Sequence, residues 1–474
     1  MVRLSALGAT ALLASTAAAN LITRECGEGL GKCPSNKPCC SQYGQCGIGA
    51  YCLGGCDPTW STTVKSCMPA PQCQSKTYKF TDSRSSPILS NTKYLGDPSK
   101  ADWVSDGQPL FANGVVYLTM APDTVGTVLS STRYVWYGKI TARMRTSRGA
   151  GVVSAFIMMS DVKDEIDYEW VGVDLKTSQT NYYWNGIPDY THSGNITVDQ
   201  GNTYSDWHTY TIDWTPESIT WSVNGQVGRV KKRSDTYNAT SGNWEFPQTP
   251  SRVQLSLWPG GLASNGQGTI DWAGGPIKWD GEDVQKNGYY YAQVSEVTVE
   301  CYNPPGGASG NGKTSYRYAD LKAVNTSVIL SNDRTDLASF LATGEDPEKE
   351  PAAPSSVTKT IISTDAAGKA TTVIDTVAPT DTNVGTVPGL NGAGFDSGDL
   401  SGGRHNGGSG DANGASNGGT GGTGTNANKA GTTGWSQSDQ STAGGNNSSD
   451  APRLFLLWGN LVAMLLVGAA MTTL

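Results

Sequence analysis

The sequence is poor in charge and in histidine, and each shortage excludes a class of function. Of its 474 residues, 34 are Lys or Arg and 42 are Asp or Glu, which gives a formal charge of −8. Without a basic surplus the chain has no cationic face for nucleic acid, so nucleic acid is not expected as a partner. The three histidines, His192, His208 and His405, are too few for a histidine-rich metal site, and His208 is expected to be structural. No cofactor motif is present, so neither a cofactor nor a metal is predicted.

Sustained helical periodicity is also missing from residues 77–302. This region instead contains short runs rich in β-branched and aromatic residues, such as VVYLTM, VVSAFIMM and RVQLSLW, which turn residues separate. About 225 residues of this kind predict one all-β sandwich or jelly roll. An extension at 303–345 is expected to add a short helix within residues 319–344. Residues 346–449 are rich in Pro, Thr and Ser and then in Gly, which predicts a disordered low-complexity stalk.

The two ends of the sequence have the composition of processing signals. Residues 1–19 combine Arg3, an apolar stretch and small residues before position 20, as a secretory signal peptide does. The apolar end of the chain follows a short polar spacer and the small residues 444–449, which is the pattern of a glycosylphosphatidylinositol (GPI) attachment signal. Residues 450–474 would then be a removed propeptide, with a retained tail anchor as the alternative. We therefore expect an extracellular protein anchored to the outer face of the plasma membrane.

Cysteine is confined almost entirely to one stretch of the chain. Nine of the ten cysteines lie between Cys26 and Cys73, and Cys301 stands apart. In an exported protein they are expected to form disulfides. The cysteine-dense segment 26–56 is too short to hold a core alone and must be stapled. N-glycosylation is expected at the sequons of Asn195, Asn238 and Asn325.

Against this scarcity of charge, the stretch DEIDYE places three acids at alternate positions, Glu165, Asp167 and Glu169. Alternate residues of an extended strand share one face. Successive acids would then be about 7 Å apart and repel by about 2 kcal/mol at an effective dielectric near 20. A strand with this penalty, placed after the apolar run VVSAFIMM in the middle of a sheet, is expected to have a function.

Three interpretations of the acids compete. A solvated face is disfavoured because the alternating partners are apolar, and a calcium site is disfavoured because calcium prefers a bent loop to a straight strand. A retaining glycosidase needs a nucleophile and an acid/base, with carboxyl groups about 5–5.5 Å apart. Glu165 and Glu169 have Cα atoms roughly 13 Å apart on an extended strand, and both side chains can lean inward. Asp167 between them can orient the nucleophile and separate the titrations of the pair.

DEIDYE resembles the active-site strand of glycoside hydrolase family 16. The flanking sequence from TVLSSTRYVWYG to EWVG resembles the Crh branch, the fungal chitin–glucan crosslinking transglycosylases, and DWHTYTIDWTPESITWSVNG and RVQLSLWPGG match further strands. The resemblance covers residues 77–302 and implies a concanavalin-like β-jelly roll whose concave sheet binds substrate. It implies that Glu165 is the nucleophile, Glu169 the acid/base proton donor and Asp167 the assisting carboxylate.

The same resemblance implies a retaining transglycosylase of the fungal cell wall. Chitin would be the donor and β-glucan or chitin the acceptor. An endo-hydrolase of chitin or β-glucan and a non-catalytic wall lectin are the alternatives, although a lectin has no use for three aligned acids. Strand alternation places Gln254 and Trp258 on one face. The donor site of the family matches this strand, so the resemblance implies that Gln254, Trp258 and Thr269 bind the donor substrate, with core packing as the alternative for Trp258.

The spacing of the cysteines in residues 26–52 resembles a hevein-like chitin-binding module, carbohydrate-binding module family 18. The module would span residues 20–56, followed by a disulfide-tied linker at 57–76. The resemblance implies chitin contacts by Ser41, Tyr43 and Tyr51. Gln45 stands where stronger binders carry an aromatic residue, a loss on the order of 1 kcal/mol, so a purely structural knot is the alternative. The implied disulfides are Cys26–Cys40, Cys33–Cys46 and Cys39–Cys52, with Cys56–Cys67 and Cys73–Cys301 as the remaining pairs.

Overall fold

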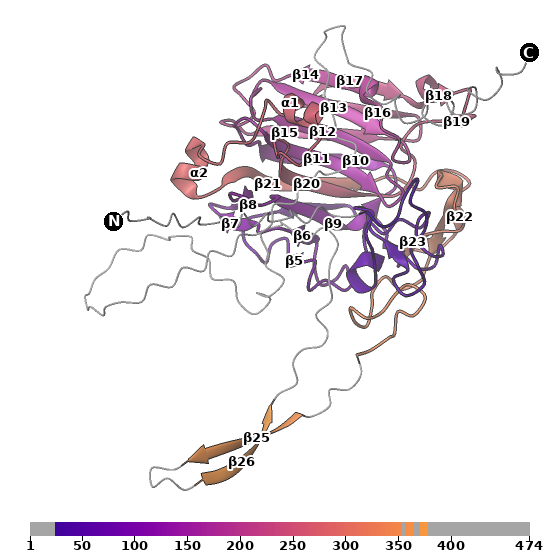
Figure 1. Cartoon of the computed structure of the whole chain (residues 1–474). Helices are drawn as coiled ribbons and strands as arrows, with labels where there is room; N and C mark the ends of the chain where they lie inside the picture. Colours follow the sequence, from indigo (N-terminus) through magenta and orange to yellow (C-terminus); the bar gives the residue numbers. More distant parts are fainter. Residues whose placement is uncertain (1–23, 352–356, 365–369, 378–474) are drawn as a thin grey trace, which may run out of the picture.

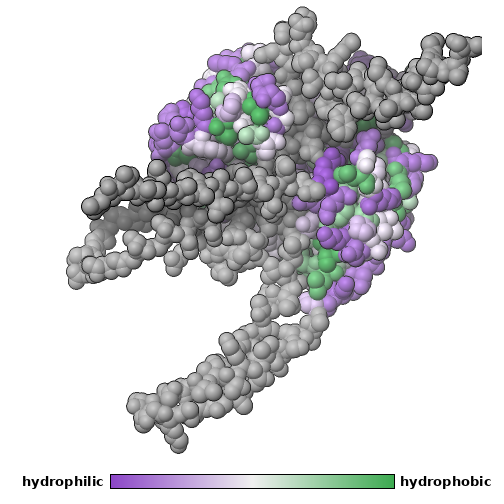
Figure 2. Space-filling model, viewed as in Figure 1, coloured by the Kyte–Doolittle hydropathy of each residue, from purple (hydrophilic) through white to green (hydrophobic). Residues whose placement is uncertain are grey.

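The structure is a computed structural model that describes residues 24–351, 357–364 and 370–377. The expected signal peptide at 1–19 and the expected GPI signal at 444–474 lie outside the described residues. Within the described part of the chain, no helix is long and apolar enough to cross a membrane. The described surface visible in Figure 2 is mostly polar, with small apolar patches between the polar residues.

Two eight-stranded sheets lie face to face and form most of the molecule (Figure 1). The first sheet has the strand order β14–β13–β12–β11–β20–β9–β6–β5. Its strands are β5 (Ile88–Ser90), β6 (Trp103–Asp106), β9 (Thr127–Val135), β11 (Val152–Ser160), β12 (Glu165–Val171), β13 (Thr177–Tyr183), β14 (Gly194–Thr197) and β20 (Ser251–Pro259).

The second sheet has the order β17–β16–β15–β10–β21–β8–β7, and β4 also pairs with β21. Its strands are β4 (Lys76–Lys79), β7 (Leu110–Ala112), β8 (Val115–Met120), β10 (Gly138–Arg145), β15 (His208–Trp214), β16 (Ser218–Val223), β17 (Gln226–Lys232) and β21 (Tyr290–Cys301). The expected runs of β-branched and aromatic residues form these strands, and the all-β sandwich prediction is confirmed.

One aromatic-rich core fills the space between the two sheets. It joins side chains of the first sheet, such as Phe156 and Tyr168, to side chains of the second, such as Ile140 and Trp214. Strand β10 shows why the sequence folds this way, because buried and partly exposed residues alternate along all of its length. Strands β11 and β20 are buried at every position, and they are neighbours in the middle of the first sheet.

Smaller elements surround the sandwich. The N-terminal module holds β1, β2 and η1, and a four-stranded sheet joins β3 to β22, β23 and β24 of the extension after residue 302. The remaining elements are β1 (Cys39–Cys40), β2 (Cys46–Gly47), η1 (Gly49–Cys52), β3 (Ala70–Pro71), η2 (Tyr190–His192), η3 (Arg233–Thr236), β18 (Tyr237–Asn238), β19 (Asn243–Trp244), α1 (Gln267–Trp272), α2 (Glu282–Asn287), β22 (Ser309–Gly310), β23 (Ser315–Tyr318), η4 (Asn325–Ser327) and β24 (Val328–Ser331).

One expectation for the C-terminal part is wrong, and the expected stalk includes a strand pair that was not predicted. The short helix expected within 319–344 is absent from that described segment, which holds only the single turn η4 and the strand β24. The β-branched run VILS of β24 pairs with β23 instead. The stalk expected from residue 346 contains a hairpin of β25 (Val357–Thr364) and β26 (Ala370–Val377). Their sequences VTKTIIST and ATTVIDTV are rich in β-branched residues, a local signal that the overall composition hid.

All ten cysteines form disulfides, in the five pairs that the resemblance and the remaining cysteines implied. Three pairs staple the N-terminal module, and Cys56–Cys67 closes the loop that follows it. Cys73–Cys301 joins residues 228 positions apart. It ties the chain before β4 to the end of β21, so both ends of the sandwich are held at one place.

We predict that replacing both Cys73 and Cys301 by Ala lowers the free energy of unfolding by about 2–5 kcal/mol, because the crosslink restricts the unfolded chain over a long loop. Urea unfolding followed by tryptophan fluorescence measures the change, and thiol titration of the unfolded variant checks that the other four disulfides remain. A transition midpoint equal to that of the wild type would show that this disulfide does not stabilise the sandwich.

Candidate active site

Strand β12 places the three expected acids on one face of the first sheet. Its alternate residues Ile166, Tyr168 and Trp170 belong to the aromatic core, so the acids project from the opposite face. The register with β11 sets Glu165 opposite Met159 and Glu169 opposite Ala155. The sequence-based placement of the acids on a central strand therefore agrees with the structure, with β11 on one side and β13 on the other.

Burial raises the pKa of every member of this acid triad. Glu165 is 4% exposed and Asp167 is 2% exposed, so removal from water disfavours their charged forms. Burial and the nearby Glu169 raise the pKa of Glu165, while a hydrogen bond from Asp167 opposes this shift. Burial and the neighbouring Glu165 raise the pKa of Asp167 well above its ordinary value. The pKa of Glu169 is raised by burial and then by Asp167.

The hydrogen bond between Glu165 and Asp167 shifts their two pKa values in opposite directions. It lowers the pKa of Glu165 and raises that of Asp167, so Asp167 keeps the proton and donates it toward the Glu165 carboxylate. Glu165 is then the group most easily ionised in this pair. In addition, Oε2 of Glu165 and Oδ1 of Asp167 are buried and have no hydrogen-bond partner among the described residues. Such unpaired buried oxygens are expected where a substrate binds.

Strand β13 supplies polar neighbours that the sequence reasoning missed. Its register sets Tyr183 opposite Glu165, Asn181 opposite Asp167 and Gln179 opposite Glu169. The amide of Asn181 donates to the hydroxyl oxygen of Tyr183 at 2.7 Å. The alternation of Gln, Asn and Tyr in TSQTNYY is the signal that would have found them, since it has the same period as the acids.

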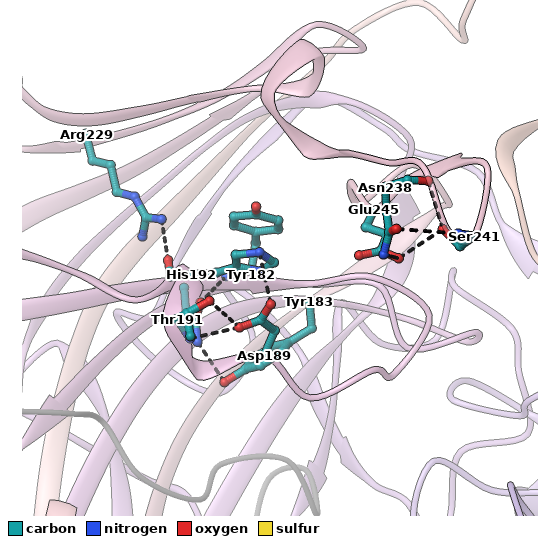
Figure 3. Close-up of polar contacts among 10 residues, drawn as sticks. Tyr182, Tyr183, Asp189, Thr191, His192, Arg229, Asn238, Ser241 and Glu245 are labelled. Carbon is teal, nitrogen blue, oxygen red and sulfur yellow. Dashed lines mark hydrogen bonds and ion pairs between the residues drawn. The ribbon is translucent and has the colours of Figure 1, made fainter. Parts of the chain in front are cut away.

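The loop between β13 and β14 is held beside Tyr183 by polar and stacking contacts (Figure 3). Asp189 accepts hydrogen bonds from the backbone N–H and the hydroxyl of Thr191, at 2.9 and 2.5 Å. Its other carboxylate oxygen lies 3.3 Å from Nε2 of His192. The His192 ring stacks on Tyr182 with the ring centroids 4.4 Å apart. These contacts hold the loop at the β13 edge of the first sheet.

On the other side of the acids, β20 holds two of the three expected substrate-binding residues. Gln254 lies opposite Ile157, which in turn lies opposite Asp167, so Gln254 is two strands from the acid in the same row. Trp258 is on the same face but is fully buried, and it packs against Trp272 of α1 with the ring centroids 6.0 Å apart. Its ring therefore contributes to an apolar wall and has no open face in this structure.

Thr269, the third expected substrate-binding residue, is 2% exposed on α1. The same short helix carries Trp272, whose indole N–H donates to Oε1 of Gln179 at 2.7 Å. Because Gln179 is opposite Glu169, α1 is attached to the edge of the acid-bearing face. The structure thus brings Thr269 to the periphery of the site, and a contact with substrate remains a prediction.

The module residues expected to bind chitin face the sandwich. Ser41 and Tyr51 are 2% and 8% exposed, and both line a cavity of about 70 Å³ together with Tyr43. The opposite wall of this cavity belongs to the first sheet and includes Asp106 and Arg252. The expected sugar-binding residues of the module therefore face the first sheet across this cavity.

The other singled-out residues have the following surroundings. His208 is buried, and its ring nitrogens contact the backbone oxygen of Asn202 and the amide of Asn224, which fits the structural role expected for it.

The three asparagines of the sequons are all at least partly exposed. Asn195 is exposed on the edge strand β14. Asn238 is partly exposed, and its amide donates to Glu245 at 2.8 Å (Figure 3). Asn325 is also partly exposed, and glycosylation at these positions stays a prediction.

Comparison with known proteins assigns this acid-bearing sandwich to a family. The model of glycosyl hydrolases family 16 matches residues 97–274, which include the three acids. The chain is 55% identical over 347 residues to Crh-like protein 2 of Aspergillus fumigatus, covering 73% of this chain and 78% of that protein. The chain belongs to the Crh-like proteins of glycosyl hydrolase family 16. It is an enzyme of this family.

Two further Crh proteins show the breadth of the similarity. Crh-like protein 3 of Botryotinia fuckeliana is 54% identical over 338 residues, covering 71% of this chain and 75% of that protein. The solved structure of the Crh5 transglycosylase in complex with NAG is 29% identical, with a TM-score of 0.46, and the match covers 58% of this chain and 99% of that one. The Crh assignment thus rests on sequence similarity that extends well beyond the acid strand.

We predict that Glu165→Gln stabilises the protein, and more so as the pH rises. Burial raises the pKa of Glu165 above its ordinary value of 4.5, so the folded chain keeps this proton at pH values where the unfolded chain has lost it. The stability that Glu165 contributes is complete below its unfolded pKa and is lost as the pH rises through its folded pKa. Gln does not titrate and avoids this loss. Thermal unfolding between about pH 4 and about pH 7.5 should show a widening gap in Tm.

The matched control for this measurement is Glu300→Gln, an exposed position on β21 of the second sheet. Its Tm should follow that of the wild type across the same pH range. A Glu165→Gln variant that is less stable than the wild type at neutral pH would contradict the burial cost assigned to the acid.

Proposed function

We propose that the protein is a retaining transglycosylase that cleaves chitin and transfers the cut chain to β-glucan or chitin. Glu165 attacks the anomeric carbon of the donor while protonated Glu169 gives its proton to the departing oxygen, and a glycosyl-enzyme forms. Glu169, now a base, takes the proton of the incoming sugar hydroxyl as that oxygen displaces Glu165. The products are a new glycosidic linkage and the regenerated pair of carboxyl groups.

The observation that carries this proposal is the set of three acids that share one face of β12. A retaining mechanism needs one ionised and one protonated carboxyl group in the same site. Burial and Glu169 raise the pKa of Glu165, and the hydrogen bond from Asp167 opposes this rise, while burial raises the pKa of Glu169 well above its ordinary value. These surroundings support Glu165 as the nucleophile, Asp167 as the assisting carboxylate and Glu169 as the acid.

The choice between transfer and hydrolysis depends on the second step. A bound acceptor hydroxyl reacts before water when the site holds the sugar close and in the correct orientation. On one side of the acids, strand β13 places Tyr183 and Asn181 next to them, where they are available to hold a sugar. Membership in the Crh-like proteins supports transfer over hydrolysis and supports chitin as the donor. An endo-hydrolase acting on chitin or β-glucan is the alternative, and it would use the same three acids.

This function places the protein in the fungal cell wall. The expected signal peptide and GPI signal would deliver it to the outer face of the plasma membrane, where donor and acceptor chains meet. Crosslinks formed there would join chitin to β-glucan. A non-catalytic wall lectin is not favoured, because buried acids with raised pKa values destabilise the fold without helping a lectin to bind sugar.

We predict that the wild type joins an unlabelled chito-oligosaccharide to a fluorescent β-glucan oligosaccharide and that Glu165→Gln and Glu169→Gln lower the rate at least about 10³-fold, because each removes a group that the chemistry needs. Asp167→Asn should cause a smaller loss, since its side chain still donates a hydrogen bond to Glu165. Chromatography of labelled products measures the rates, with Glu300→Gln as the control of unchanged activity. Labelled products that become only shorter than the acceptor would establish hydrolysis. Turnover by Glu165→Gln at the wild-type rate would refute the mechanism.

A further inference from the structure

The N-terminal module reaches onto the same sheet face as the acids. Oε1 of Gln42 accepts a hydrogen bond from Nη2 of Arg252 at 2.8 Å and from Nε2 of Gln254 at 3.3 Å. Both donors are on β20 and, being alternate residues, lie on the acid-bearing face of the first sheet. A module residue thus contacts a residue expected to bind the donor.

These contacts fix the orientation of the Gln254 amide. A guanidinium group can only donate hydrogen bonds, so Arg252 holds the oxygen of Gln42 toward itself. That oxygen can receive only an N–H from Gln254, which leaves Oε1 of Gln254 as the outward acceptor. This oxygen is buried and has no hydrogen-bond partner among the residues that the structure describes. A hydroxyl or acetamido N–H of a sugar would satisfy it.

Tyr43 lies farther along the same face. Its hydroxyl hydrogen-bonds to the carboxyl group of Asp106, and its ring packs on the apolar cluster that contains Val128 and Trp258. In the strand register, Asp106 lies opposite Val128, and the same row of paired residues continues across β20 and β11 to Glu169. Four strand spacings separate the ends of this row, about 19 Å. Only a donor chain of several sugar residues would extend from the acids to Tyr43.

A buried polar network holds the module in this position. The backbone N–H of Gly55 donates to Oδ1 of Asp161 at 2.9 Å and to the Tyr134 hydroxyl at 3.0 Å. The Gly54 backbone lies close to this network, since a Cβ atom there would lie 2.7 Å from Nη1 of Arg252 and would displace that side chain. Asp161 and Arg252 are both 8% exposed. The network thus holds the module against the first sheet.

We propose that the N-terminal module is the distal part of the donor site and not an independent chitin anchor. Gln42 is a positioning residue that acts through Gln254, and Tyr43, with Asp106 opposite, forms a composite subsite for the far end of a long donor. This assignment rests on the proposed function in one respect only: the side of the acids toward β20 is taken as the donor side. It explains why Ser41, Tyr43 and Tyr51 line a cavity shared with the sheet.

The role of Gln42 is tested with a pair of variants in the full chain. Gln42→Leu removes the acceptor that holds Gln254, whereas Gln42→Glu keeps an oxygen for both donors. With a chito-oligosaccharide donor and a labelled glucan acceptor, Gln42→Leu should raise the donor KM several-fold with a smaller change in kcat. Gln42→Glu should restore a donor KM near that of the wild type. Equal donor KM values for the wild type and Gln42→Leu would overturn the positioning role.

The composite subsite is tested by donor length. In Tyr43→Ala, kcat/KM for long chito-oligosaccharides should fall several-fold while kcat/KM for the shortest active donor stays unchanged. Tyr302→Ala, an exposed position whose hydroxyl bonds to Asp213 of the second sheet, is the matched control. An unchanged length profile would overturn the proposal, and so would a gain for long donors, which would mean that the module obstructs the site. Thermal unfolding of each variant verifies that the module remains folded.

A binding measurement separates this inference from the proposed function. If the wild type makes no elongated product, the proposed function fails, but titration calorimetry with long and short chito-oligosaccharides still tests the subsite. The wild type should bind the long chain more tightly than Tyr43→Ala does and the short chain equally. If both proteins bind both chains equally, and Tyr43→Ala loses only its retention on insoluble chitin, the module is an independent anchor and the inference is wrong.

Discussion

The site depends on one constraint: strand β12 packs core residues on one face and carries the three acids on the other. Its inner face is fixed by aromatic packing, with Tyr168 stacked between Phe156 and Trp170. The Tyr168 hydroxyl donates to the carbonyl of Ser222 on the opposite sheet. A second contact between the sheets is made by the indole of Trp221, which donates to the carbonyl of Asp167 at 3.0 Å. The core thus holds the strand in one register, and every acid on the other face is held with it.

The acids depend on this fixed strand, but their burial lowers the stability of the fold. Carboxyl groups that are close together and removed from water cannot all ionise, so the triad keeps protons that free carboxylic acids would lose at neutral pH. The large apolar core offsets the cost to stability. This arrangement also makes the two glutamates chemically different, because Asp167 shares a proton with Glu165 and not with Glu169. A site with three equally solvated acids would lack this distinction.

The sequence predicted those features that depend on local period and composition. The alternation of acids with Ile166, Tyr168 and Trp170 was enough to place the triad on one face of a central strand, because a period of two has only one structural meaning in a β-rich chain. The hairpin at β25 and β26 was missed because its β-branched residues lie within a segment rich in Pro, Ser and Thr. The helix expected in the extension was wrong because pairing with β23 outweighed local propensity.

Contacts between distant segments were beyond the reach of the sequence. The approach of Gln42 to Gln254 joins residues 212 positions apart, and no local pattern signals it. The same holds for Tyr183 and Asn181, whose position beside the acids depends on the register of β13. The position of Ser41, Tyr43 and Tyr51 depends on how a stapled module docks on a sheet. A resemblance to isolated sugar-binding modules assigned these residues to the module alone, whereas in the assembled chain they line a cavity shared with the sheet.

The most direct test of the account is to identify the residue that carries the donor sugar during turnover. The enzyme is mixed with a chito-oligosaccharide, quenched in acid within the first turnovers and digested, and the peptides are sequenced by mass spectrometry. The account predicts a glycosyl ester on the carboxyl group of Glu165. A sugar attached to Glu169 or Asp167, or product formation without any glycosylated peptide at any quench time, would contradict it.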